Sequence, residues 1–164
     1  MVNVLDKVQP KNKKQLKQLI DYAFKHNIYD LNFIDTSKIT DMTLLFSKCN
    51  YNIDISRWDM SNVINMSYMF YHCKNFNCDL LYWDVSNVTD MNHMFYKCNM
   101  FTGKGLENWD VSKVADMELM FTWCKIFNAD LSNWDISNIT RWKNMFGGCD
   151  KMSIPNWYKL YHRK

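Results

Sequence analysis

Six cysteines are the residues of this chain best suited to chemistry, and five of them recur at a nearly constant interval. The five are Cys49, Cys73, Cys98, Cys124 and Cys149. If equal intervals bring them side by side, neighbouring Cα atoms would lie about 5 Å apart, within reach of a disulfide. A string of metal-bound thiolates is a second reading, although the chain has no Cys-x-x-Cys pair. We favour reduced, buried thiols that pack as small apolar groups, because each cysteine closes an apolar run.

An aspartate column recurs with the same interval, and each aspartate lies two residues before a serine. Its members are Asp35, Asp59, Asp84, Asp110 and Asp135. Carboxylates in register hold Ca²⁺ in some repeat proteins, usually beside Gly-rich turns, and this column has no such turn. Aspartate side chains also accept hydrogen bonds from nearby backbone N–H groups in turns. We therefore predict that these carboxylates accept backbone N–H groups.

The other residue types used in catalysis do not combine into a site. The four histidines are His26, His72, His93 and His162, and no two of them share a position in the repeat. The serines and aspartates belong to the repeat itself, and no Gly-rich phosphate loop is present. We therefore expect no catalytic residue, no cofactor, no metal and no enzyme activity.

An internal repeat accounts for these intervals and fills most of the chain. Its copies begin at Ile34, Trp58, Trp83, Trp109 and Trp134, so the steps are 24, 25, 26 and 25 residues. A phenylalanine column accompanies them at Phe46, Phe70, Phe95, Phe121 and Phe146. Such a period is typical of coils that stack on their neighbours at about 4.8 Å. We expect the Phe and Cys series to form interior columns, with each buried Phe or Trp contributing about 2–3 kcal/mol.

Each coil is predicted to contain a short strand, a turn and a short helix. The string TDMNHMFYKC (89–98) has apolar residues at spacing i, i+3, i+4, i+7, which indicates one face of a helix. The string FNADLSNW (127–134) alternates in the manner of a strand. WDVSNV (83–88) is typical of a turn.

The two ends are predicted to be caps of a single domain, divided as 1–33, 34–152 and 153–164. Residues 11–27 form an amphipathic helix pattern, which would cover the first coil. Its apolar face consists of Leu16, Leu19, Ile20, Ala23 and Phe24. The segment after Pro155 would close the far edge with Trp157, Leu160 and Tyr161.

The strings WDVSNVTDMNHMF and FNADLSNWDISNIT, with the lead-in PKNKKQLKQLI, resemble a known group over about residues 10–152. They are similar to the BspA-like leucine-rich-repeat surface proteins, and specifically to their lipoprotein-associated repeat of unknown function. The resemblance implies an α/β repeat: a right-handed leucine-rich-repeat-like solenoid of about five coils of 24–26 residues with an N-terminal capping helix. Members occur in bacterial surface proteins and in large DNA viruses, and the family provides no catalytic residues to carry over.

Charge and hydropathy exclude some classes of binding partner and bear on the compartment. The net charge is +3, and the Lys and Arg residues do not gather into one central stripe, so we expect no nucleic acid. No run of about 18 apolar residues is present, so we expect no membrane insertion. The N-terminus lacks the apolar run of a signal peptide, which predicts a cytoplasmic protein, and the family resemblance adds a virus-associated one; we expect surface exposure only if another route exports the protein.

Binding would use the positions that vary between copies. One candidate row is the strand flank, made of Arg57, Tyr82, Asn108 and Asn133. A second is an aromatic patch of Tyr71, Tyr96 and Trp123 on successive coils. Because exposed Tyr, Trp and Arg anchor protein partners, we predict a non-enzymatic scaffold for protein–protein interaction, with self-association possible. The alternatives are a structural or assembly protein, for example of a virion, and an adhesive or carbohydrate-binding module.

Overall fold

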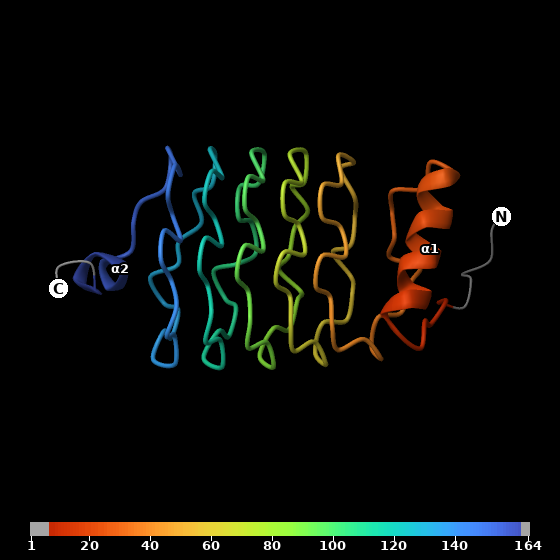
Figure 1. Ribbon diagram of the computed structural model, residues 1–164, viewed down its shortest axis with the longest axis horizontal. Coiled ribbons are helices and arrows are strands. Elements are labelled where there is room, and N and C mark those ends of the chain that lie inside the picture. The colour runs from red at the N-terminus through yellow and green to blue at the C-terminus, as the bar shows by residue number, and fades with distance from the viewer. Residues whose placement is uncertain (1–6, 162–164) are drawn as a thin grey trace.

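The computed structural model describes residues 7–161, and for residue 161 it describes the backbone alone. Successive repeats lie side by side along the long axis, with helices at the two opposite ends of this stack (Figure 1). Helix α1 (Lys13–Lys25) stands beside the first repeat, and helix α2 (Asn156–Tyr161) lies beyond the last. Between residues 7 and 161 the chain forms no regular strand, only isolated parallel bridges.

The predicted α/β repeat, a right-handed leucine-rich-repeat-like solenoid with a strand and a helix in each coil, is wrong. Outside α1 and α2, the described coils consist of turns and irregular segments. Segment 89–98, expected to be helical, contains His93 and Lys97 with φ angles of 54° and 59°, which end any right-handed helix. Segment 127–134, expected to be a strand, contains no ladder of paired residues.

The spacing between coils explains why no helix forms there. Phe rings of neighbouring coils have centroids only 5.4–5.7 Å apart, whereas a helix with its side chains is about 10 Å across. In segment 66–73, alternate N–H groups therefore donate to carbonyls of the next coil, at N···O distances of 2.7–2.9 Å. From residue 69 onward, the intervening N–H groups donate to the carbonyl three residues earlier. This pattern satisfies the backbone inside a coil thin enough to stack.

The phenylalanine column runs through the interior without a break. Rings of successive members lie within 7° of parallel, from Phe46 to Phe146. A second aromatic column packs beside it, for example with Phe76 centred 4.0 Å from Phe70. In the first coil, 44% of Tyr51 is exposed, and its ring lies 5.0 Å from Phe24 of α1. The Phe series is therefore interior as predicted, and the Cys series is interior except at Cys49 and Cys149, which are only partly buried.

Tryptophans join each coil to the one before it through their indole N–H groups. Trp58, Trp83, Trp109, Trp134 and Trp157 donate to the carbonyls of Leu31, Ile55, Leu80, Leu106 and Leu131, at 2.9–3.3 Å. Buried indole N–H groups require such a partner. The repeated Trp therefore fills the core and also fixes the register between coils.

Both ends carry caps. The helix predicted over residues 11–27 is confirmed as α1, which buries Leu16 and Ile20 completely. The Asn12 side chain caps this helix by accepting the N–H of Gln15 at 3.0 Å.

At the far end, Trp157 lies 6.2 Å and Tyr158 lies 4.9 Å from Phe146, measured between ring centroids. The predicted capping role of Leu160 is wrong, since 66% of Leu160 is exposed, and the side chain of Tyr161 lies outside the described residues. Neither α1 nor α2 has the length and apolar character that a bilayer span demands.

Candidate protein-binding surface

The aspartate column is used for turn formation, as predicted. In all five copies Oδ1 accepts the backbone N–H of the serine two residues on, at 3.0 Å. Hydrogen bonds from the Ser86 side chain and backbone lower the pKa of Asp84, because they favour the charged form. Within residues 7–161, no three His, Cys, Asp or Glu side chains are arranged to hold a metal ion.

The thiols of the cysteine column are free; the three central ones are buried, and those of Cys49 and Cys149 at its two ends are partly buried. From Cys73 onward, each column Sγ donates to the carbonyl of the phenylalanine one coil earlier, with Sγ···O distances of 2.9–3.0 Å. Burial raises the pKa of the Cys73 thiol to about 12 and that of Cys149 to about 11. These thiols therefore stay protonated near neutral pH and pack as small apolar groups.

Four rings from two neighbouring coils form what we call the aromatic cluster: Tyr68, Tyr71, His93 and Tyr96. The ring centroids of Tyr71 and Tyr96 are 5.2 Å apart with the planes 11° from parallel. Those of Tyr68 and His93 are 4.4 Å apart at 10°. Tyr71 and His93 complete the cluster with a centroid separation of 6.3 Å. All four side chains are half-buried, so one edge of the cluster faces solvent.

The left-handed turns place two of these rings. Tyr68 and His93 occupy the same repeat position, and their φ angles are 58° and 54°. The N–H of Tyr68 donates to the carbonyl of Asn92 at 2.9 Å, which holds the two coils in register. The Asn92 side chain also contacts the His93 ring, with Nδ1 and Oδ1 3.1 Å apart. The ring stack is therefore fixed by the backbone beneath it.

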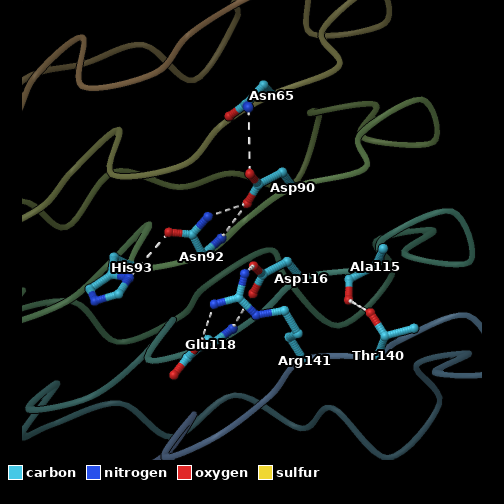
Figure 2. Close-up of polar contacts among 9 residues, drawn as sticks. All are labelled: Asn65, Asp90, Asn92, His93, Ala115, Asp116, Glu118, Thr140 and Arg141. Atoms are coloured by element: carbon cyan, nitrogen blue, oxygen red, sulfur yellow. Dashed lines mark hydrogen bonds and ion pairs between the residues drawn. The ribbon is translucent and has the colours of Figure 1, made fainter.

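A ladder of polar side chains reaches the cluster at His93, through Asn92 (Figure 2). The guanidinium of Arg141 lies between two carboxylates, 3.1 Å from Asp116 and 2.6 Å from Glu118. Asn65 donates to Asp90 at 3.5 Å, one coil away. Burial lowers the pKa of His93, while Glu118 and Asp116 act in the opposite direction. The ladder gives this side of the cluster a mixed but mainly acidic border.

The predicted partner-binding residues fall into two separate groups. Tyr71 and Tyr96 are brought together as expected, and Trp123, 48% exposed, lies on the next coil. Its ring lies close to Gly148, where an added Cβ would approach to 2.7 Å. The strand-flank row is exposed throughout, with Tyr82 78% exposed. The row consists of Arg57, Tyr82, Asn108 and Asn133.

Sequence reasoning left Tyr68 and His93 out of the candidate site. Each lies ten residues after the Trp that opens its copy, so their shared column was visible in the sequence. The shared column was missed because one member is Tyr and the other is His. The positions of the histidines in the repeat were compared only with one another. A search for any ring in a shared column would have found the pair.

These features define a repeat protein of thin, turn-built coils that stack through buried aromatic columns. The chain belongs to the family described as Mycoplasma protein of unknown function, DUF285, which matches residues 14–105 and 100–159. This family is related to the BspA-like repeat proteins. No curated protein and no solved structure matches the chain.

Proposed function

We propose that the protein is a non-enzymatic scaffold that binds another protein through the aromatic cluster. One observation supports the proposal above the others. Two coils hold Tyr71 and Tyr96 as a stacked pair 5.2 Å apart, beside a second stacked pair formed by Tyr68 and His93. Tyrosine is among the residues that contribute most to protein interfaces, because it offers a large ring and a polar tip.

The rigidity of the coils favours binding by this surface. Backbone hydrogen bonds between segments 66–72 and 90–96 fix the rings before a partner arrives. A preformed surface loses little conformational entropy on association, so more of the contact free energy appears as affinity. The strand-flank row presents Tyr82 with 78% exposure, and it remains the second candidate surface.

The test is quantitative co-precipitation from the native host, with proteins measured by mass spectrometry. We expect the double variant Tyr71→Ala/Tyr96→Ala to recover a specific partner at least tenfold less than wild type. The matched control is Tyr22→Ala on α1, which removes an equally large ring that is 61% exposed. Circular dichroism and thermal melting establish that the variants are folded. Undiminished recovery by the double variant would refute the proposal.

A third variant separates the two candidate surfaces. Arg57→Ala/Tyr82→Ala removes the larger side chains of the strand-flank row and leaves the aromatic cluster intact. If only this variant loses the partner, the strand flank is the binding surface and the cluster is not. If recovered material is only the protein itself, the assembly alternative replaces the scaffold.

The place of the chain within its family is also a proposal. We propose kinship with BspA-like surface proteins or their virus-encoded counterparts, supported by strings such as WDVSNVTDMNHMF (83–95). Surface members act outside the cell, where glycans are available ligands. Quenching of Trp123 fluorescence by sugars, lost in Trp123→Phe, would favour the carbohydrate-binding alternative over a protein partner.

A further inference from the structure

A row of lysines runs along the corner of the coils that contains the cysteine column. Corner segments 47–51, 71–75, 96–100 and 122–126 each contain one lysine and no Asp or Glu. These four residues, which we call the lysine ridge, are Lys48, Lys74, Lys97 and Lys125. Acidic residues return only in the fifth corner, with Asp150. The ridge therefore extends over four consecutive coils with one sign of charge.

Backbone hydrogen bonds show that these corners are neighbours in space. Lys48 donates its N–H to the carbonyl of Tyr71 at 2.7 Å, and Lys97 donates to that of Thr122 at 2.8 Å. Between them, His72 donates to Tyr96 at 2.7 Å. The amine of Lys97 also lies 5.3 Å from the centroid of the Tyr96 ring, within cation–π range. The ridge thus borders the aromatic cluster.

The ridge charges are not neutralised by neighbouring side chains. The ion pairs among the described residues use Lys13, Lys17, Lys104 and Arg141, and none of them includes a ridge lysine. Burial lowers the pKa of His72, and the positive charges of Lys97, Lys48 and Lys74 lower it further. The carboxylates of the coils are held in turns elsewhere, as in the aspartate column.

One end of the ridge meets an apolar groove between α1 and the first coil. The groove has a volume of about 490 Å³, and its lining includes Phe24, Leu44, Tyr51 and the ridge residue Lys48. Lys17 also lines it and is paired with Asp21 at 3.0 Å. Leu44 is 54% exposed and Tyr51 is 44% exposed, so the groove presents apolar surface to solvent.

We propose that the lysine ridge binds an acidic, extended segment of the partner protein, with an apolar side chain of that segment in the groove. The inference rests on the proposed scaffold function and names the chemistry of its partner. Three coil steps at the ring spacing of 5.4–5.7 Å make the ridge about 17 Å long, which about five extended residues span. The groove favours a polypeptide, because its aliphatic lining, such as Leu44 and Leu45, suits an aliphatic side chain better than a polar-edged nucleobase.

The test measures binding of defined probes to the full chain by fluorescence anisotropy. The first probe is a labelled peptide of about ten residues in which every second residue is Glu and the residue at one end is Leu. The second replaces each Glu by Gln, and the third is single-stranded DNA of the same charge. We expect the Glu peptide to bind at least tenfold more tightly than the Gln peptide, with affinity falling as salt rises.

Charge variants locate the site on the ridge. Lys74→Gln/Lys97→Gln is expected to weaken the Glu peptide at least tenfold, because it removes the two central cations. Lys38→Gln/Lys143→Gln changes the net charge equally at exposed positions outside the four ridge segments, and we expect less than a twofold effect. If both variants lose affinity for the Glu peptide equally, net charge alone explains the binding and the proposal is overturned.

The remaining outcomes separate this inference from the proposed function. If the DNA binds more tightly than the Glu peptide, and Lys74→Gln/Lys97→Gln abolishes this binding, a polypeptide is the wrong ligand. If Tyr71→Ala/Tyr96→Ala loses the native partner and Lys74→Gln/Lys97→Gln retains it, the scaffold function stands and the acidic segment is refuted. Loss of the native partner in both variants, with control binding unchanged, would support both.

Discussion

At the residue scale, a column cysteine is held by two coils at once. The Cys98 thiol is fully buried and donates to the carbonyl of Phe70 at 3.0 Å, and its own N–H donates to Phe95 at 2.9 Å. A serine would offer the same donor but less apolar volume, and a larger residue would meet the neighbouring coil. The thiol is therefore a small apolar group that also satisfies an interior carbonyl.

Stability should fall at alkaline pH because of these thiols. Burial raises the pKa of Cys73 to about 12, whereas an unfolded thiol titrates near about 8.5. The folded state then binds a proton that the unfolded state releases, so stability is complete below about pH 8.5 and declines as pH rises toward 12. We expect a slope of up to about 1.4 kcal/mol per pH unit for this thiol.

Urea unfolding at a series of pH values measures this slope. Cys73→Ala should lower the free energy of unfolding at neutral pH but flatten its decline above about pH 9. Cys49→Ala is the matched control, because Cys49 is only partly buried, and a hydrogen bond with the Tyr51 backbone and the charge of Lys17 oppose the rise in pKa that burial causes. Identical pH profiles for the two variants would show that the Cys73 thiol does not carry the effect.

At the element scale, the interior columns were predictable from the sequence and the path of the coil was not. The spacing of apolar residues indicates which side chains face inward, but it carries no information about the backbone φ angles. A helix and a chain that turns left-handed at every fourth residue both place positions i, i+3, i+4 and i+7 on one side, so Met91, Met94, Phe95 and Cys98 fit either path. The narrow coil spacing decides between them, and the expected spacing of about 4.8 Å was not weighed against the width of a helix, about 10 Å.

The candidate site was predictable in part for a related reason. Tyr71 and Tyr96 share a column and were expected to meet, and they do. Their tilted ring contacts with Tyr68 and His93 depend on the left-handed turns, which bring the rings of two columns to the same surface. Because the expected helix has no such turns, its geometry gave no reason to join these columns.

The left-handed positions predict a stabilising substitution. Leu44 has φ 60° and is 54% exposed, so it bears the strain of that region while its side chain gains little from burial. Asn144 occupies the same repeat position in the last coil, with φ 54°. Because Asn tolerates this region better than Leu, Leu44→Asn should raise the free energy of unfolding by about 0.5–1 kcal/mol.

Thermal and urea unfolding measure the change. The control is Ile64→Asn, since Ile64 is exposed to a similar extent, 51%, and is not among the residues with positive φ. Ile64→Asn should leave the free energy of unfolding unchanged or lower it, because Asn relieves no backbone strain where φ is negative. A loss of stability in Leu44→Asn equal to that in Ile64→Asn would mean that backbone strain at this position is negligible.

At the scale of the whole molecule, the repeat separates charge by corner. The aspartate column, which contains Asp35 and Asp84, concentrates carboxylates at one turn, and the cysteine corner concentrates lysines such as Lys74. The net charge of +3 conceals this separation. A chain of nearly neutral composition can therefore present a ridge of one sign, since repetition places like charges in line.

The same repetition makes stability a sum of contacts between neighbours, so the position of a substitution along the stack should matter. Phe95→Ala removes a fully buried ring stacked on both sides, and we expect it to cost about 3–5 kcal/mol. Phe146→Ala lies at the end, and its effect should be smaller and local. Hydrogen exchange of the Phe121 N–H, bonded to Met145, should accelerate in Phe146→Ala, while that of the Phe70 N–H, bonded to Met94, should not. Equal acceleration of both amides in Phe146→Ala would mean that the coils unfold as one unit rather than neighbour by neighbour.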